Sequence, residues 1–228
     1  MKSKEIGFDI SEAVLALGLK CAVFTLSNVE NRDADREFEE IKARVTKEVL
    51  TGLSLEKIAS DPILQGFRQL HEAVGRSNRK YVSSAENLLK VLLQTGQLPH
   101  VNLLVDIYNL VSVKTCLSLG AHDVSAICGK VSLRLTTGEE RFWPLGSDTL
   151  KPVGLGEYAY VDDQNNMLCR LEVRQGEKTK IRLGTTECFY IVQGNPVVGS
   201  EYLTAVMEEL IVLTKRFCGG QERLLYVP

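Results

Sequence analysis

The segment from Val101 to Leu117 constrains the fold more than any other part of this chain, because it is apolar almost throughout. Among its polar exceptions are Asn102, Asp106 and Asn109, which follow one another at i, i+4 and i+7. On a helix, this spacing places the three side chains within about 60° of one another. The segment therefore predicts a buried helix with one polar stripe. Polar groups in apolar surroundings need hydrogen-bond partners, so the stripe either bonds the backbone of the fold or lines a cavity.

Composition limits the kind of protein that surrounds this helix. Of 228 residues, 44% are hydrophobic and 25% are charged, which is usual for a folded globular protein. The chain has 27 Lys and Arg against 29 Asp and Glu, and the formal net charge of −2 argues against a broad basic surface for nucleic acid. Aromatic residues make up 7%, so an aromatic stacking surface is not evident. At roughly 150 residues per domain, the length allows one sizeable domain or two small ones.

The lack of a recognisable targeting signal and the scattered cysteines lead us to expect a cytoplasmic protein with reduced thiols. No run of 18 apolar residues is present, so we expect no membrane-spanning helix. The charged stretch Met1–Ser11 lacks the apolar core of a secretory signal. The cysteines are scattered and form no CxxC pair, so we expect mostly buried thiols, no metal site and no cofactor. They are Cys21, Cys116, Cys128, Cys169, Cys188 and Cys218.

Apolar periodicity predicts one strand and then several helices in the first half of the chain. Cys21–Leu26 is a compact run of strand-forming residues. Helix-capping residues mark where the amphipathic helices begin. The predicted helices follow Asp33–Asp35, run from Asp61-Pro62 to Gly75, and run from a Ser83/Glu86 capping box to Gly96. The basic connection Gly75–Lys80 reads either as a solvated loop or as a loop that contacts phosphates.

Short strands dominate the chain after Gly120, and one amphipathic helix, about Glu201–Phe217, closes it before Gly219-Gly220. This order predicts an α+β fold with an antiparallel sheet or small barrel and flanking helices. Neither a linker nor an internal repeat interrupts the sequence, so we expect residues 1–228 to form a single domain. The predicted strands are Val131–Leu135, Arg141–Trp143, Glu157–Val161, Met167–Val173, Thr179–Leu183 and Cys188–Val192.

Recognisable catalytic motifs are lacking, since the sequence contains no GxGxxG, phosphate loop, GxSxG or HExxH. The three histidines are far apart in the sequence. We expect His71 to be a surface or boundary residue of its helix and His100 to lie in a loop. Only His122 stands beside an acid, Asp123, so the residues alone make a weak case for a metal site or a nucleophilic enzyme.

The stripe nevertheless carries a resemblance. Asn102-Leu-Leu-Val-Asp106-Ile-Tyr-Asn109 is similar to the Asn-x-x-Val-Asp-x-x-Asn helix of the bacterial phenylalanyl-tRNA synthetase β subunit. In that enzyme the helix belongs to the B3/B4 region, which hydrolyses mischarged tyrosyl-tRNA. The chain also resembles freestanding B3/B4 proteins from roughly Leu19 to Gly220, which implies a B3/B4-like fold. The motifs are Lys80-Tyr-Val-Ser-Ser84, Gly156-Glu157-Tyr-Ala-Tyr160-Val-Asp162 and Cys169-Arg170…Arg174-Gln175…Thr179.

One departure from the synthetase pattern bears on chemistry. Gly120 aligns with the histidine linked to editing, and His122 falls two positions later. Asn109 and Asp123 match an asparagine and an aspartate of the synthetase pocket. The pocket glutamate has only an ambiguous counterpart in Glu187. The resemblance therefore implies a retained pocket with altered or lost chemistry.

The function implied by the resemblance is RNA binding with trans-editing, in which a wrong amino acid is hydrolysed from an aminoacyl-tRNA. Asn109, Asp106 and Asp123 would be catalytic. The substrate-binding residues would be Asn102, His122, Arg174, Gln175 and Thr179. Arg76, Arg79 and Lys80 would contact tRNA phosphates. One alternative is a non-catalytic module that binds RNA or an amino-acid-like ligand. Another is that the polar stripe has a purely structural role.

Overall fold

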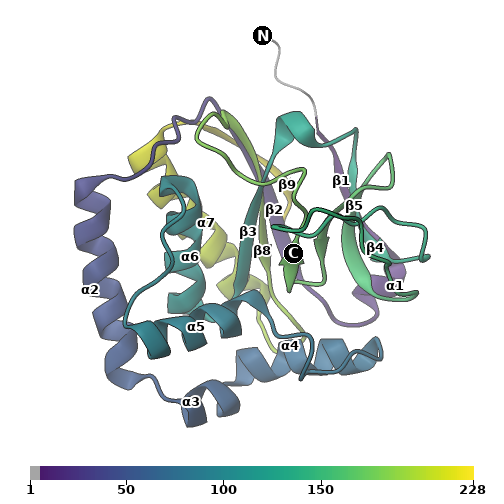
Figure 1. The fold of residues 1–228 in the computed structure, drawn as a ribbon, viewed down its shortest axis with the longest axis horizontal. Coiled ribbons are helices and arrows are strands. Elements are labelled where there is room, and N and C mark those ends of the chain that lie inside the picture. Colours follow the sequence, from purple (N-terminus) through teal and green to yellow (C-terminus); the bar gives the residue numbers. More distant parts are fainter. Residues whose placement is uncertain (1–5) are drawn as a thin grey trace.

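A layer of helices, a four-stranded sheet and a five-stranded sheet lie side by side in the computed structural model, which describes residues 6–228 (Figure 1). The four-stranded sheet has the order β3-β8-β2-β9 and is antiparallel throughout. The five-stranded sheet has the order β1-β4-β5-β6-β7, in which only the β1–β4 pair is parallel. The α+β prediction is confirmed, but the sheets formed by the described residues are open, so the small-barrel alternative is wrong.

The element bounds show which predicted segments form. The strands are β1 (Phe8–Ile10), β2 (Cys21–Ser27), β3 (Ser118–Asp123), β4 (Val131–Leu135), β5 (Tyr158–Asp162), β6 (Met167–Arg170), β7 (Arg174–Gln175), β8 (Glu187–Gln193) and β9 (Gln221–Tyr226). The helices are α1 (Glu12–Leu15), α2 (Arg36–Gly52), α3 (Leu55–Ser60), α4 (Pro62–Ala73), α5 (Ser84–Thr95), α6 (Leu103–Thr115) and α7 (Ser200–Cys218), with a 3₁₀ turn at Val124–Ala126.

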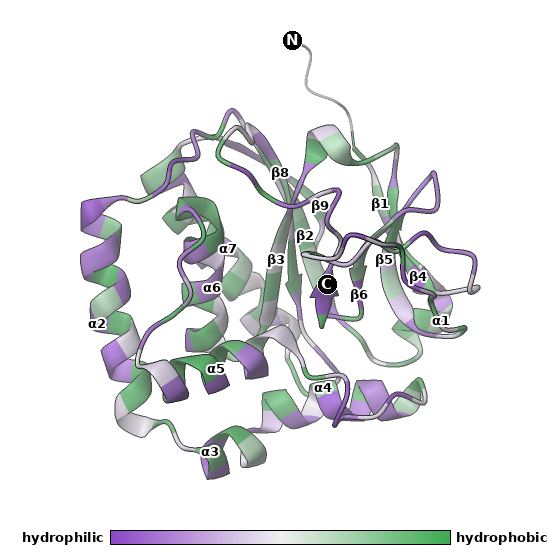
Figure 2. Cartoon of the chain, in the orientation of Figure 1, coloured by the Kyte–Doolittle hydropathy of each residue, from purple (hydrophilic) through white to green (hydrophobic). Residues whose placement is uncertain are grey.

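Strand β2 shows how the central sheet separates two cores. Successive strand side chains point to opposite faces. Ala22, Phe24 and Leu26 therefore pack against the helices, whereas Cys21 and Val23 pack against the five-stranded sheet. Both faces are buried, and the central strands are correspondingly hydrophobic in Figure 2. A strand buried on both faces reads as an apolar run without alternation, which is why the sequence identified it.

Helix α6 is the buried helix that the sequence predicted. Every residue of this helix except Lys114 is buried, because it packs against α5, α7 and β3. Asn102 caps its N-terminus, where the side-chain oxygen accepts a hydrogen bond from the Val105 amide. The helix therefore supplies a rigid wall against which a site can be built.

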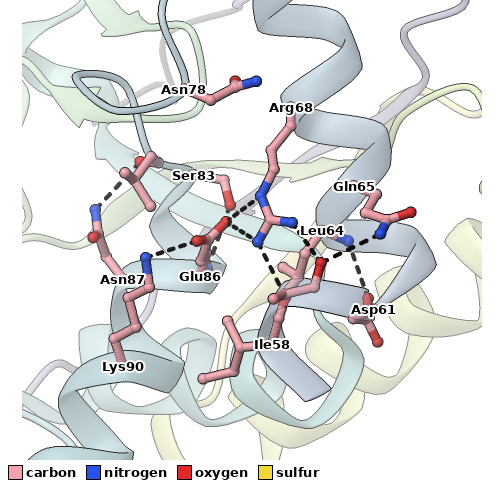
Figure 3. Close-up of polar contacts among 12 residues, drawn as sticks. Ile58, Asp61, Leu64, Gln65, Arg68, Asn78, Ser83, Glu86, Asn87 and Lys90 are labelled. Carbon is pink, nitrogen blue, oxygen red and sulfur yellow. Dashed lines mark hydrogen bonds and ion pairs between the residues drawn. The ribbon is translucent and has the colours of Figure 1, made fainter. Parts of the chain in front are cut away.

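Helix α5 is held in place by an ion-pair network centred on the buried Glu86 (Figure 3). Ser83 caps the helix by accepting a hydrogen bond from the Glu86 amide, as predicted. The Glu86 carboxylate pairs with Arg68 of α4, at 2.9 Å, and with Lys90, at 2.7 Å. Arg68 also donates to the Ile58 and Ala59 carbonyls at the end of α3. This one guanidinium fixes three helices relative to one another (Figure 3).

Two predicted strands do not form. Arg141–Trp143 makes only isolated bridges, one from Arg141 to Asn166 and one from Phe142 to Lys151. Thr179–Leu183 is irregular because a turn closes just after it. The Arg182 amide donates to the Thr185 hydroxyl, and the Thr185 amide donates to the Arg182 carbonyl, each at 3.0 Å.

The sequence predicts reduced and mostly buried thiols, and in the structure the cysteines are unpaired. All six cysteines are free, and three of them, Cys21, Cys188 and Cys218, are fully buried. Over residues 6–228, no helix combines the length and the hydropathy needed to cross a bilayer.

Candidate functional site

A cavity of about 420 Å³ opens where α5 and α6 meet strand β3 and the β6–β7 segment. Its walls are mainly apolar, with side chains such as Leu88, Val91, Val101 and Val105. Polar groups are few and come from different elements. They include Asn87, Asn109, Ser118, His122, Glu172, Arg174, Gln175 and Gln193. An apolar cavity of this volume with a few convergent polar groups is typical of a small-molecule site.

Two polar residues of the cavity lining, His122 and Ser118, each have a buried side-chain atom with no hydrogen-bond partner among residues 6–228. The Nδ1 of His122 lies 2.8 Å from the Thr179 hydroxyl, and the buried Nε2 is the ring atom left without a partner in the described part of the chain. Burial lowers the pKa of His122 to about 3, because the charged imidazolium is poorly solvated there. The ring is therefore neutral at physiological pH, and one nitrogen is left for a bound ligand.

Gly120 lies on β3 two residues before His122 and lines the same cavity. A Cβ at position 120 would come within 3.1 Å of the Gln175 side-chain nitrogen. That nitrogen donates to the Ala121 carbonyl at 3.0 Å. Gln175 therefore occupies the space into which a larger side chain at position 120 would project. Where the synthetase resemblance expects the editing histidine, this chain has a glutamine amide arriving from another strand.

The three side chains of the predicted polar stripe point in different directions. Asn109 lines the cavity and is 8% exposed. Asn102 lies outside the helix as its cap and accepts a further hydrogen bond from the Asn31 amide group at 3.1 Å. Asp106 points away from the cavity toward α2, where Lys42 donates to it at 2.9 Å. Of the three, Asn109 is the one positioned to touch a ligand in this cavity.

Some of the remaining candidates for catalysis and substrate binding line the cavity, and others lie outside its lining. Arg174 and Gln175 line the cavity, and the Arg174 guanidinium donates to the Leu145 carbonyl at 2.6 Å. Thr179 lies behind His122 and contacts its ring. Asp123 is outside the cavity lining and accepts hydrogen bonds from Ser125 and from the Thr185 hydroxyl, at 2.6 Å for the latter. The carboxylates of Asp106 and Asp123 therefore both bond to other parts of the fold, and neither residue lines the cavity.

The basic connection before α5 is only partly available for phosphates. Arg76 forms an ion pair with buried Glu157 at 2.6 Å and donates to the Leu155 carbonyl. Arg79 and Lys80 are exposed. None of these three side chains lines the cavity.

A buried polar network in the cavity wall was not predicted from the sequence. Glu172 accepts hydrogen bonds from the Tyr158 hydroxyl at 2.6 Å and from the Gln193 amide at 3.0 Å, and pairs with His71 at 2.5 Å. The expectation that His71 is a surface or boundary residue is wrong, since it is 1% exposed. Its spacing from Leu64, Phe67 and Val74 puts it on the apolar face of its helix, which is the signal that was overlooked.

One further cluster has the donor atoms of a cation site. Glu39, His100 and Asp106 bring ligand atoms within 4.8 Å of one another. The Lys42 ammonium, however, already donates to Glu39 and Asp106, at 2.8 and 2.9 Å. Lys42 therefore supplies the positive charge that a metal ion would otherwise bring.

Comparison with known proteins agrees with this architecture. A family model described as the B3/4 domain matches residues 68–216, which is more than half of the chain and contains every residue that lines the cavity. The chain belongs to the B3/4 domain family. The B3/B4 resemblance deduced from the motifs is thereby confirmed.

Among solved structures, the chain is similar to an N-terminal fragment of the phenylalanyl-tRNA synthetase β-subunit from Pyrococcus horikoshii. The two share 12% sequence identity with a TM-score of 0.47, and the match covers 97% of this chain. The chain spans about half of that fragment, 51% of its length. No curated protein matches the sequence.

Proposed function

We propose that this B3/4 domain protein is a trans-editing hydrolase, which binds aminoacyl-tRNA and hydrolyses the ester of a wrongly attached amino acid. The observation that carries the proposal is the neutral His122 ring, which lines an apolar cavity of about 420 Å³ together with Asn109 and whose buried Nε2 has no hydrogen-bond partner among residues 6–228. An amino-acid side chain would occupy the apolar part of the cavity. The ester would lie near the polar groups.

The contact between the Thr179 hydroxyl and His122 Nδ1 links the hydroxyl proton to the tautomer of the ring. When the Thr179 hydroxyl donates to Nδ1, its own proton is satisfied and the buried Nε2 carries the ring hydrogen. A ring whose pKa is about 3 is also a poor proton acceptor at neutral pH. We therefore assign His122 as a neutral hydrogen-bond donor to the ester carbonyl oxygen rather than as a general base.

Hydrolysis needs a positioned water and a leaving group. Water attacks the carbonyl carbon, the bond to the ribose oxygen breaks, and that oxygen leaves with a proton. In our proposal His122 stabilises the negative charge that develops on the carbonyl oxygen, and the Asn109 amide orients the water or the amino group. The vicinal ribose hydroxyl of the substrate assists proton transfer, so the reaction does not require a carboxylate in the cavity. Asp106 and Asp123 then act by stabilising the walls.

The proposal is tested by incubating the protein with a panel of mischarged aminoacyl-tRNAs and following ester loss. We expect one or more esters to be lost faster than in buffer. His122→Leu should lower kcat by about 10²- to 10³-fold, the cost of removing one donor to a developing oxyanion. His100→Leu removes an exposed histidine outside the cavity and should retain the rate. No ester loss above buffer, or a rate that His122→Leu leaves unchanged, would overturn the proposal.

A non-catalytic binding module is the second candidate, favoured by Gly120 at the position of the editing histidine. Such a module would bind a non-hydrolysable aminoacyl-adenosine amide in the same cavity yet leave every ester intact. Exposed Arg79 and Lys80 would add salt-dependent affinity for tRNA in both cases. If the ligand is an aminoacyl group on another carrier, ester loss will occur without dependence on tRNA.

A further inference from the structure

A second hollow, of about 310 Å³, lies next to the cavity and is lined in part by Trp143, Arg141, Lys178 and the backbone of Gly176. We refer to it as the Trp143 groove. It contains the one tryptophan of the chain. The indole N–H donates to the Ser147 carbonyl, which holds the ring in place, yet 44% of the residue stays exposed. Because a hydrogen bond fixes the indole ring and much of the residue is exposed, a planar group such as a nucleobase could stack on it.

The charges around the groove favour an anionic partner. Arg141 and Lys178 are exposed bases, and Asp148 is the one acid in the lining. Arg141 donates to the Gln164 carbonyl and forms no ion pair within residues 6–228. Lys178 contacts the Cys128 thiol, at 3.6 Å. Both cations are therefore available to phosphates at a groove whose net charge is +1.

A short backbone ladder joins the groove to the cavity. The Glu177 amide donates to the Trp143 carbonyl at 2.7 Å, and the Leu145 amide donates to the Gln175 carbonyl at 2.8 Å. Along this ladder Gln175 and Leu145 line the cavity, whereas Gly176 and Trp143 line the groove. The two hollows therefore share the backbone segments that carry Trp143 to Leu145 and Gln175 to Gly176.

Gly176 lets two backbone segments of the groove approach closely. A Cβ at this position would come within 2.7 Å of the Met167 carbonyl, so the close backbone approach requires glycine. The groove thus combines an exposed aromatic ring with two cations. These are the features with which proteins bind single-stranded nucleic acid through base stacking and phosphate contacts.

We propose that the Trp143 groove stacks a nucleobase at the single-stranded 3′ end of the RNA, while the ester-linked amino acid enters the cavity. Arg141 and Lys178 contact the phosphates on either side of that base. The proposal rests on the trans-editing function for the identity of the RNA. It assigns the recognition of the nucleotide to a surface distinct from the exposed bases Arg79 and Lys80.

The single tryptophan makes the stacking directly measurable. Titrating the full chain with the trinucleotide CCA should quench Trp143 emission, whereas a trinucleotide with an abasic 3′ residue should quench it less and bind more weakly. With fluorescein-labelled CCA followed by anisotropy, Trp143→Leu should weaken binding by about tenfold, in the range of one stacked base. Trp143→Phe should recover part of the affinity. Tyr202→Leu, which removes a similarly exposed aromatic residue on α7, should bind as wild type does.

Salt dependence tests the phosphate contact of Arg141. Arg141→Gln should flatten the plot of log affinity against log salt by about one phosphate contact. Arg36→Gln, a fully exposed arginine on α2, should leave the slope unchanged.

Three outcomes separate this proposal from the hydrolase proposal. Unchanged emission together with wild-type affinity of Trp143→Leu would overturn the stacking proposal, even if the protein hydrolyses esters. Equal binding of CCA and of the abasic trinucleotide would also overturn it, because phosphates alone would then carry the affinity. Base-dependent quenching without ester loss from any aminoacyl-tRNA would support stacking and refute the hydrolase.

Discussion

The carboxylate of Glu172 joins three elements in the wall of the cavity. It is 3% exposed and accepts hydrogen bonds from His71, Tyr158 and Gln193, which come from three different elements. Replacing it with alanine leaves these three groups without that acceptor. Removing one partner of a buried charged pair costs about 3–5 kcal/mol. We therefore predict that Glu172→Ala lowers the free energy of unfolding by about this amount.

Urea denaturation followed by circular dichroism measures this loss, and the melting temperature should fall by roughly 6–20 °C for a chain of this size. The matched control is Glu209→Ala, which removes an acid that pairs with Lys114 at 2.6 Å where both side chains are more than a third exposed. Such a surface pair contributes about 0–1 kcal/mol. If Glu172→Ala costs no more than Glu209→Ala, the network does not support the wall and the reasoning is refuted.

The stability that Glu172→Ala removes should also depend on pH. Burial alone would lower the pKa of His71, but the hydrogen bond and the charge of Glu172 raise it above its usual value. The protonated ring therefore contributes stability that is fully present below its unfolded pKa of about 6.5 and is lost as pH rises through the higher folded pKa. We expect the difference between wild type and Glu172→Ala to shrink at alkaline pH. A difference that grows with pH would contradict the assignment.

Three further substitutions separate the ligand wall from its supports. Thr179→Val removes the partner of His122 Nδ1 and frees the ring to change tautomer. It should slow deacylation in single-turnover assays, while the free energy of unfolding falls by only about 1 kcal/mol. An unchanged rate would argue against the orienting hydrogen bond. Asp106→Ala deprives Lys42 of a buried partner and should cost about 1.5–3 kcal/mol in urea titrations, with the rate per folded molecule retained. Asn102→Ala should cost about 1 kcal/mol through loss of the α6 cap, and a larger effect on kcat than on stability would mean that it touches the substrate after all.

Local chemistry explains what could be predicted from the sequence. The α6 helix, its apolar surroundings and the caps at Asp61 and Ser83 follow from short-range patterns, and the structure forms all of them. Strand β3 was missed because Gly120 and His122 are weak strand formers. Its pairing with β8, residue by residue from Ser118 to Asp123, overrides that local preference.

The site was harder to predict than the fold because its polar groups depend on distant partners. The spacing of Asn102, Asp106 and Asn109 suggested one stripe, but Asn102 lies outside the helix and Lys42 draws Asp106 to the α2 side. The His122 ring depends on Thr179, 57 residues away. No periodicity within a segment reports such contacts. The motif resemblance pointed to Asn109, Arg174 and Gln175, and these three residues line the cavity.

Nitrogen-15 NMR of the imidazole rings tests most directly whether the cavity binds an aminoacyl group through His122. The chain has only three histidines, so their signals can be assigned by single substitution. The probe is a set of 3′-aminoacylamino-adenosines, in which an amide replaces the labile ester. The account predicts that at least one analogue shifts the Nε2 resonance of His122 and leaves the exposed His100 unmoved. If no analogue at millimolar concentration moves His122, the central claim is contradicted.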